Sequence, residues 1–548
     1  MGLFDSFPRS NAYAVNLDWI MKKIREVEEF VRNYAAVNNV AYAGVWDITK
    51  QYPQWALVTD GDSSWMSLKP VPVGIPLENA EYWQKLADLD PRISGIIVQL
   101  ADAEQNIKDL QSKVANIKIA NVLDYGAIGD GVADCTNAFN DAYASGLPVW
   151  IPYGDYHLTG KVTLGDCKVD GVLHGGNVEI TGTLTANPSA NIFEDTSITI
   201  TDVSKNPEGY PDWFGGNIQR CVDIFPTTIL LPHKYTLSAN LKLSNSNTAL
   251  VGDREILPSN NYGYPVPLID VGNYKIICGN PDITVINDMP RSIAVKNIAV
   301  NSGAGEAFLV AGLLYGQFDN ITVMCDSSSG SGFTIYHCVA TRFNRIRVQV
   351  VDAGSAFFGY FIPGETNIAA GCNASVYFTN CSIDNTWTRT PAPNNTRGFF
   401  FIGDPTDTYI TDCETARCDY GIVFDLTNVK STIHDVIIKG CIFDDCFKSC
   451  VQVFDNNSHS GVLMFSDCYF AKGNYGIPDG VFIALNSNVT IMLECQIINS
   501  ETDAYAIQFT GTTPSAIIKC AMTDSGLGTE LPGTNISKTI VRNGTLMN

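Results

Sequence analysis

The sequence predicts a mainly β chain, a parallel β-solenoid that follows α-helical coiled-coil segments. The first observation is a six-residue pattern that recurs after residue 295, with centres at residues 298, 321, 346, 381, 413, 441, 468, 495 and 520. The second is that cysteine occupies the centre of the last six copies. The third is a long apolar seam before residue 120 with steps of three and four residues. A strand–turn unit that repeats every 20 to 40 residues or so is typical of a solenoid.

Two seams before residue 120 have the spacing of coiled-coil core positions. Mixed isoleucine and leucine at both rows of the second seam favours three strands, so we expect a homotrimer. The alternative is a helix that packs on its own domain. The first seam is Leu17, Ile20, Ile24, Val27, Val31 and Tyr34, and the second is Leu86, Leu89, Ile93, Ile96, Leu100, Ala103, Ile107, Leu110, Val114 and Ile117.

The segment between the seams is rich in aromatic residues and turn signals, which predicts short strands. It resembles the small carbohydrate-binding-like β modules of phage tail proteins. Exposed rings could stack on sugars, or the rings could form the core of a domain too small to use aliphatic residues alone. We favour the core. The aromatic residues are Tyr42, Trp46, Tyr52, Trp55, Trp65, Tyr82 and Trp83.

The solenoid is expected to begin after the second seam, at Asn121-Val122-Leu123-Asp124-Tyr125-Gly126. Gly129-Asp130-Gly131 follows, and later Val149-Trp150-Ile151-Pro152. These residues resemble the opening of the pectate-lyase-like β-helix of bacteriophage tail spikes. The resemblance implies a right-handed parallel β-helix, with a tight turn at Gly129–Gly131, a helix around Thr136–Ala144 that covers its open end, and a strand before Pro152. Asp130 and Asp134 are interpreted as turn and helix-start residues, not as catalysts.

A second, degenerate copy of this opening follows about 80 residues later. Tyr210-Pro211-Asp212-Trp213-Phe214-Gly215 is similar to another tail-spike opening, and Pro232 parallels Pro152. The Gly-Asp-Gly turn is missing here, so the copy could be an insertion or a new start. The expected domains are 1–38 (virion attachment, with a heptad helix), 39–84 (aromatic β module), 85–118 (trimeric coiled coil), 119–206 (cap and first rungs), 207–290 (second start or insertion) and 291–548 (regular rungs).

The repeated pattern places its central residue and the residue two positions later inside, because strand side chains alternate between faces. The polar residue before the centre should mark a corner. Six central cysteines should form an internal column of free thiols, since metal-ligand spacing is absent and a single file offers no tetrahedron. These cysteines are Cys381, Cys413, Cys441, Cys468, Cys495 and Cys520.

Acidic pairs near the corners are the candidates for chemistry, because glycoside hydrolysis needs two carboxylates. The candidate catalytic residues are Asp467 with Glu494 on adjacent rungs and Asp412 with Glu414 around one corner; Asp444 and Asp445 follow another corner. The alternative is that these acids have no catalytic role and are only solvent-exposed turn residues. Arg342, Arg345 and Arg347 could serve a lyase, but no acidic ligand cluster accompanies them. No cofactor and no metal site is predicted.

A net charge of −22 disfavours nucleic-acid binding. The sequence has neither a membrane span nor a secretory signal, so we expect folding in a host cytoplasm. The resemblance implies a phage tail spike or tail fibre that joins other virion proteins through its N-terminal region and binds a host surface polysaccharide during adsorption. A polysaccharide depolymerase, either a hydrolase or a lyase, on the same solenoid remains the alternative. A secreted pectinase-like enzyme is less favoured.

Overall fold

The computed structural model divides the chain into two compact units, Met1–Lys118 and Ile119–Asn548. Among the residues that the structure describes, no helix is long and apolar enough to cross a membrane. The described residues are 41–61, 63–88, 106–108, 119–253, 267–283, 285–303, 305–325, 331–350, 355–360, 375–385, 396–403, 406–427, 433–454, 461–471, 483–486, 490–498, 507–509, 515–523, 540–542 and 545–547.

The first unit contains a four-stranded sheet with the order β1-β2-β3-β4. Its strands are β1 (Ala41–Val45), β2 (Ala56–Asp60), β3 (Ser63–Ser67) and β4 (Trp83–Asp88). Aromatic rings build the core, as favoured above: Tyr52 and Trp83 are buried, with ring centroids 5.4 Å apart. Trp55 is exposed instead. Strand β4 extends four residues past the expected end of the module at residue 84. Both heptad seams lie mostly outside the described residues; residues 106–108, which belong to the second seam, are described and are helical.

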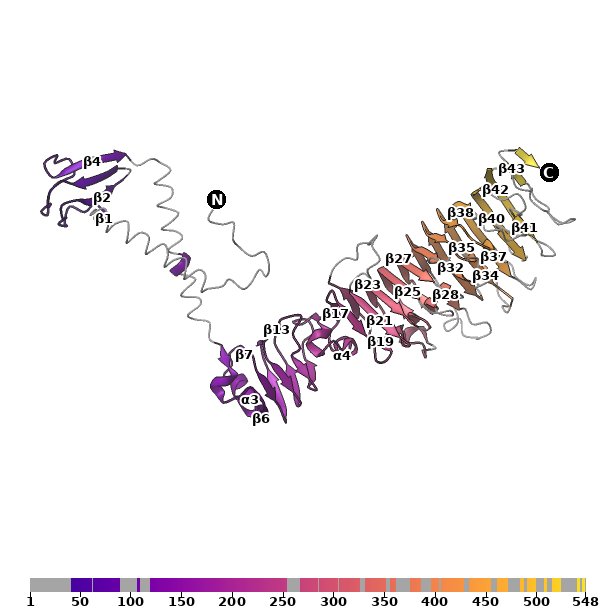
Figure 1. The fold of residues 1–548 in the computed structure, drawn as a ribbon, viewed down its shortest axis with the longest axis horizontal. Helices are drawn as coiled ribbons and strands as arrows, with labels where there is room; N and C mark the ends of the chain where they lie inside the picture. Colours follow the sequence, from indigo (N-terminus) through magenta and orange to yellow (C-terminus); the bar gives the residue numbers. More distant parts are fainter. Residues whose placement is uncertain are drawn as a thin grey trace. The chain divides into compact units, whose positions relative to one another are not determined.

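The second unit begins with three small parallel sheets, drawn in purple in Figure 1. Their strands are β5 (Ala120–Asn121), β7 (Val149–Ile151), β10 (Cys167–Val169) and β13 (Leu184–Ala186); β6 (Asp130–Asp134), β8 (Asp155–His157), β11 (Val172–His174) and β14 (Phe193–Glu194); and β9 (Lys161–Leu164), β12 (Asn177–Ile180) and β15 (Ser197–Ile200).

The helix predicted at the start of the solenoid is confirmed as α3, Thr136–Ala144, after the 3-10 turn η1 (Val122–Tyr125). Phe139 of α3 is fully buried and meets the ring of Tyr156 edge-on, at 5.5 Å between centroids. Asp134 accepts hydrogen bonds from the Thr136 hydroxyl and N–H, which lower the pKa of its carboxyl. Its position at the helix start agrees with the structural interpretation given above.

A second short helix separates two hydrophobic cores. The 3-10 turn η2 (Pro211–Phe214) and α4 (Ile218–Ile224) repeat the order of η1 and α3, and Gly126 and Gly215 end the two turns with positive φ. In α4, Cys221 belongs to the core of the first coils, whereas Ile218 and Val222 belong to the core of the later coils. The second opening therefore closes one core and starts another.

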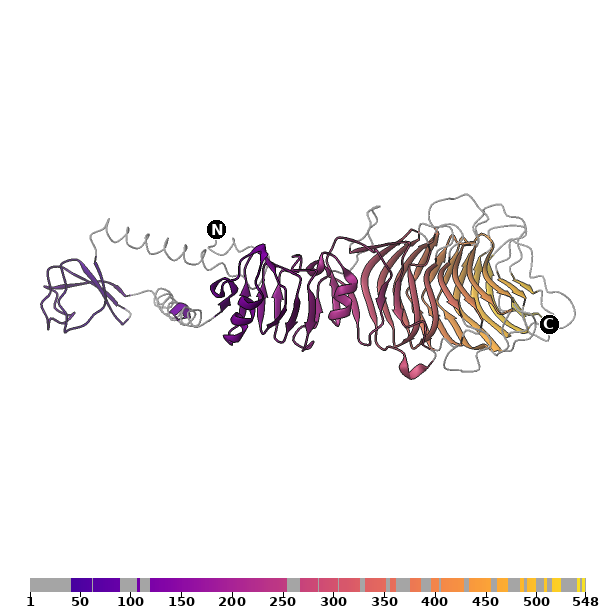
Figure 2. The ribbon, with the colours of Figure 1, turned by 90° about the horizontal axis from the view of Figure 1, so that it is seen from below.

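The later coils form two long sheets that run side by side through the magenta to yellow part of Figures 1 and 2. Nineteen described strands form one: β16 (Glu208–Gly209), β17 (Thr227–Leu230), β18 (Lys234–Thr236), β20 (Ala249–Gly252), β21 (Leu268–Gly272), β23 (Ala294–Ser302), β25 (Gln317–Cys325), β27 (Arg342–Val350), β29 (Val376–Thr379), β30 (Ser382–Asn385), β32 (Thr406–Thr411), β33 (Glu414–Ala416), β35 (Ile433–Lys439), β36 (Ile442–Asp444), β38 (Gly461–Ala471), β40 (Thr490–Ile498), β42 (Ser515–Thr523), β43 (Ile540–Arg542) and β44 (Thr545–Met547).

The second long sheet contains ten described strands, and a 3-10 turn, η3 (Ile286–Asp288), lies between two coils. Its strands are β19 (Leu241–Leu243), β22 (Ile276–Gly279), β24 (Phe308–Leu314), β26 (Ser331–Val339), β28 (Ser355–Tyr360), β31 (Arg397–Ile402), β34 (Tyr420–Asp425), β37 (Ser449–Phe454), β39 (Ile483–Asn486) and β41 (Ile507–Phe509).

The predicted register of the repeats is confirmed. Ile298 pairs with Ile321, Ile321 with Ile346, and Cys468 with Cys495, all in parallel strands. The phenylalanine that opens several copies also stacks on its counterpart: Phe343 lies 4.9 Å from Phe318 and 5.0 Å from Phe378 between centroids. Identical side chains therefore lie above one another, about 4.8 Å per coil.

The predicted file of thiols is confirmed for its described members. Cys381, Cys413, Cys441, Cys468 and Cys495 are buried and form no disulfide. Hydrogen bonds with its neighbours Cys381 and Cys441, together with burial, raise the pKa of the Cys413 thiol. Cysteine is a small, polarisable side chain that suits such a tight column. The side chain of Cys520 lies outside the described residues, although its backbone pairs with Arg542.

In seven of the nine copies the residue before the centre adopts a left-handed backbone, which turns the coil at that corner. The φ angle lies between 52° and 63° in these copies, and asparagine, aspartate and glycine tolerate this region best. Arg345 is the exception in residue type, and two hydrogen bonds to Asp319 hold it there. The corner residues are Asn297, Asn320, Arg345, Asn380, Asp412, Gly440 and Asp467.

Replacing Asn380 with valine should lower the free energy of unfolding by about 1–2 kcal/mol, because a β-branched side chain is strained at positive φ. Denaturant unfolding of the full chain measures the change. Asn380→Gly is the matched control, since it keeps the backbone freedom and removes only the side chain. Equal losses in the two variants would contradict the role of this corner conformation.

Candidate functional site

The strands that follow the corners present a charged outer face, which we call the charged face. It consists of Arg347, Asp384, Glu414, Arg417 and Asp444, from β27, β30, β33, the turn after β33, and β36. The alternating residues of these strands, such as Ile383 and Thr415, are buried in the core. Strand alternation therefore directs the first and third residues after each centre outward.

Asp384 is the carboxyl of this face whose environment differs most from water. Its side chain is only 24% exposed and pairs with the Arg417 guanidinium through Oδ2. Burial raises the pKa of Asp384, although the charges of Arg417 and Arg347 act in the opposite direction. Oδ1 is buried and has no hydrogen-bond partner among the described residues. A protonated Asp384 could therefore donate a hydrogen bond from this oxygen.

Glu414 is the second carboxyl of the charged face, and it is exposed. Ser382 pairs with Glu414 and Asp384 pairs with Ala416, so Glu414 and Asp384 are diagonal neighbours on adjacent coils. Strand geometry places their Cα atoms roughly 8 Å apart. Asp444 lies in the column of Asp384, one coil beyond Ala416. One half-buried and one exposed carboxyl therefore share a face at a spacing that a sugar and a water molecule could occupy.

The three arginines considered for a lyase have separate partners. Arg345 makes a bidentate ion pair with Asp319, and Arg342 lies over the ring of Tyr377 with its guanidinium 5.3 Å from the centroid. Arg347 is the one that belongs to the charged face and lowers the pKa of Asp384. The arginines therefore do not form one anion site.

The sequence-predicted acids fall into two groups. Glu414 lies on the charged face, but its predicted partner Asp412 is an exposed corner residue whose Oδ1 lies against Gly440 of the next coil. Asp467 is also an exposed corner residue. It is a bulged position with no partner in β40, because Glu494 pairs with Ser466 and the register shifts there. The repeat pattern predicts that Asp467 aligns with Glu494 of the next coil. In the structure Glu494 pairs instead with Ser466, one residue before Asp467.

Sequence reasoning missed Asp384, although the pattern contained a signal for it. Its position, three residues after the centre, is the second outward position of the rung. Asp444, named above as a candidate, occupies the same position two coils later, whereas Asp445 is a corner residue with positive φ. Aligning the outward residues of adjacent coils would have placed Asp384 diagonally to Glu414. The burial of Asp384 leaves no local sequence mark.

These observations define a parallel-stranded, β-helix-like solenoid with two carboxyls on the outer face of adjacent coils. Residues 119–219 match the family described as "Rhamnogalacturonase A/epimerase, pectate lyase-like". Among curated proteins, rhamnogalacturonase A of Aspergillus niger is 34% identical over 88 residues, which cover 16% of this chain and 20% of that protein. Probable rhamnogalacturonase B of Aspergillus terreus is 26% identical over 339 residues, 56% of this chain and 60% of that protein.

The chain thus spans from a fifth to about three fifths of the length of these relatives. Among solved structures, the A-module of mannuronan C-5 epimerase AlgE4 from Azotobacter vinelandii has a TM-score of 0.33 at 14% identity, covering 77% of this chain and 99% of that one. The surface adhesin PfbA of Streptococcus pneumoniae has a TM-score of 0.29 at 13% identity, covering 79% of this chain and 98% of that one.

Proposed function

We propose that this chain hydrolyses a polysaccharide at the charged face. One observation carries the proposal: Asp384 lies diagonally across from exposed Glu414, and it has a raised pKa and a carboxyl oxygen without a hydrogen-bond partner among the described residues. Two carboxyls in such different environments suit one acid and one base. The rhamnogalacturonase names of the sequence relatives support a polysaccharide substrate.

In the proposed reaction, protonated Asp384 donates its proton to the glycosidic oxygen as the bond to the anomeric carbon breaks. Glu414 accepts a proton from the water whose oxygen forms the new bond at that carbon. Asp384 ends ionised and Glu414 protonated, and solvent exchange restores both. A carboxyl separation of roughly 6.5–9.5 Å leaves room for the water and leads to inversion. Taking the carboxyl separation to follow the Cα spacing of roughly 8 Å, we expect a product with inverted anomeric configuration.

A panel of purified bacterial capsular and wall polysaccharides and plant pectins, incubated with the full chain, tests the proposal. Soluble oligosaccharides with new reducing ends are expected, and proton NMR at early times should show the inverted anomer. Unsaturated sugar ends, detected by ultraviolet absorbance, would assign a lyase instead. The hydrolase is overturned if a glycan that binds the chain stays intact.

Replacing Arg417 with glutamine should move the alkaline limb of the pH–rate profile to higher pH. Arg417 lowers the pKa of Asp384, so its loss raises that pKa further, and the proton that catalysis needs is kept to higher pH. Initial rates across the pH range measure the limb. Arg417→Lys keeps the charge and should leave the limb close to that of the unaltered chain. A shift to lower pH would contradict the acid role of Asp384.

We further propose that the chain works as a homotrimeric phage tail spike, which adsorbs to the host polysaccharide and attaches to the virion through its N-terminal residues. The apolar seam from Leu86 to Ile117 supports this second proposal, because nine consecutive steps alternate between three and four residues. The relatives named above support the enzymatic role more directly.

Native mass spectrometry of the full chain should give three times the monomer mass. Aspartate at the seam positions Ile96 and Ile107 should dissociate the trimer, because buried charges oppose each other at the core rows. Lys108→Glu, a charge change outside the seam, is the control and should leave the mass unchanged. A monomeric unaltered chain would contradict the trimer.

A further inference from the structure

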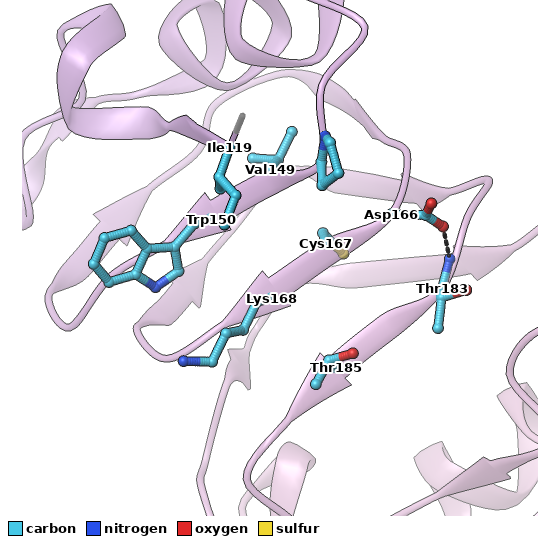
Figure 3. A pocket seen from close by; sticks show the side chains of 9 residues that line it. Ile119, Val149, Trp150, Asp166, Cys167, Lys168, Thr183 and Thr185 are labelled. Atoms are coloured by element: carbon cyan, nitrogen blue, oxygen red, sulfur yellow. Dashed lines mark hydrogen bonds between the residues drawn. The ribbon is translucent and has the colours of Figure 1, made fainter. Parts of the chain in front are cut away.

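A pocket of about 380 Å³ lies on the outer face of the first coils, far along the chain from the charged face. It covers the sheet formed by β5, β7, β10 and β13, and Figure 3 shows the Trp150 and Lys168 side chains extending from neighbouring strands beside each other. Its lining is mainly apolar with a few polar groups, as in small-ligand sites. The lining residues are Ile119, Pro148, Val149, Trp150, Asp166, Cys167, Lys168, Thr183 and Thr185.

The Trp150 ring is held in a fixed orientation. Its indole Nε1 donates a hydrogen bond of 2.9 Å to Asp170 Oδ2, and the Lys168 ammonium lies 2.8 Å from the same oxygen. The Lys168 nitrogen is also 6.0 Å from the centroid of the indole. Trp150, Lys168 and Thr185 occupy paired positions on three adjacent strands. An aromatic face and an ordered row of polar groups are therefore set before any ligand arrives.

This combination suits a sugar ring. The flat indole matches the C–H face of a pyranose, while the Lys168 ammonium can donate, the Asp166 carboxylate can accept and the Thr185 hydroxyl can do either with ring hydroxyls. Lys168 is already neutralised by Asp170, and Asp166 adds another carboxylate at the rim. The local charge therefore opposes an anionic uronate and favours an uncharged sugar.

We propose that this pocket, the Trp150 site, binds a neutral pyranose unit of a glycan without cleaving it. We take this glycan to be the polymer that the charged face acts on, and this assumption rests on the proposed function. The Trp150 site lies on the coils around the first core and the charged face on the coils around the second core, and α4 lies between the two cores. The Trp150 site thus holds the polymer while the charged face acts on another part of it.

A glycan array that carries neutral and uronate-containing oligosaccharides tests the proposal, with the fluorescently labelled full chain as the probe. Asp384→Asn serves as the background, so that no bound glycan is cleaved. We expect binding to neutral pyranose oligosaccharides, and we expect Trp150→Ala to weaken the affinity for the bound glycan at least tenfold in calorimetric titration. Trp150→Phe keeps an aromatic face and should retain most of the affinity.

Circular dichroism and the melting temperature show whether each variant folds. If Trp150→Ala does not fold, the glycan affinity of Trp150→Phe is the deciding measurement. No bound neutral glycan, binding confined to uronates, or unchanged affinity in a folded Trp150→Ala would overturn the proposal. A change of oligomeric mass in Trp150→Ala would assign the pocket to a second copy of this chain and overturn it as well.

The Trp150 site and the proposed function fail in different ways. If the charged face does not cleave glycans, neutral oligosaccharides still bind the unaltered chain through Trp150. If the Trp150 site does not bind glycans, cleavage of short oligosaccharides persists. With both sites active, Trp150→Ala should raise KM for long polymers and leave kcat on short oligosaccharides unchanged.

Discussion

Asp384→Asn should lower kcat for polysaccharide cleavage by about 10²–10⁴-fold, the usual contribution of a general acid. Asparagine has nearly the same shape but no acidic proton, and it can still face Arg417. Reducing-end release from the bound polysaccharide measures the loss. Because the change is nearly isosteric, glycan affinity should stay close to that of the unaltered chain.

Asp467→Asn is the matched control for this prediction. Asp467 is an exposed corner residue at φ 56°, and asparagine tolerates that backbone as well as aspartate does. Its activity should equal that of the unaltered chain, whereas Glu414→Gln should lose activity together with Asp384→Asn. Full activity in Asp384→Asn, or equal losses at Asp467 and Asp384, would reject Asp384 as the acid.

Asp384→Asn should also change how the free energy of unfolding depends on pH. A carboxyl whose pKa is raised in the folded chain binds its proton more tightly there than in the unfolded chain. It therefore favours folding at low pH, and that contribution is lost as the pH rises through the raised pKa. Asp384→Asn should remove this part of the pH dependence of the unfolding midpoint.

Phe343→Ala should lower the free energy of unfolding by about 3–5 kcal/mol, the usual cost of removing a buried phenylalanine ring. Phe343 is fully buried, and it stacks between Phe318 and Phe378 at interplanar angles of 11° and 12°. The coils on both sides cannot close the gap, because their strands are fixed by the hydrogen-bonded register. Denaturant unfolding, followed by circular dichroism, measures the change.

Phe454→Ala provides the comparison, since Phe454 ends β37 and is 39% exposed. Loss of this ring should lower the free energy of unfolding by only about 0.5 kcal/mol, as at most surface positions. If the two phenylalanine variants lost the same stability, the stacked rings would not carry the stability of the later coils.

The repeated core of the fold could be predicted from sequence because its signals are local and periodic. The alternation around each centre predicted the buried file from Cys381 to Cys495, and helix α3 occupies the residues that the resemblance to the tail-spike opening indicated. The corner residues were recognisable because few residue types accept a left-handed backbone. Periodicity could not reveal the bulge at Asp467, where a single inserted residue shifts the register of Glu494.

The candidate site was less predictable because it depends on contacts between coils. Glu414 was identified by its charge near a corner, but its partner Asp384 is 30 residues away and Arg417 comes from the neighbouring coil. The raised pKa of Asp384 results from burial by segments that only the folded register brings together. The sequence identifies the acidic residues, and the stacking of the coils determines which of them is buried.

Helix α4 gives the second unit a division that the continuous stack of strands conceals. With Cys221 facing one core and Val222 the other, the helix seals each apolar interior against the other. Unfolding of the coils on one side would then expose a closed end instead of an open row of side chains. We therefore expect the unit to unfold as two cooperative blocks that meet at α4.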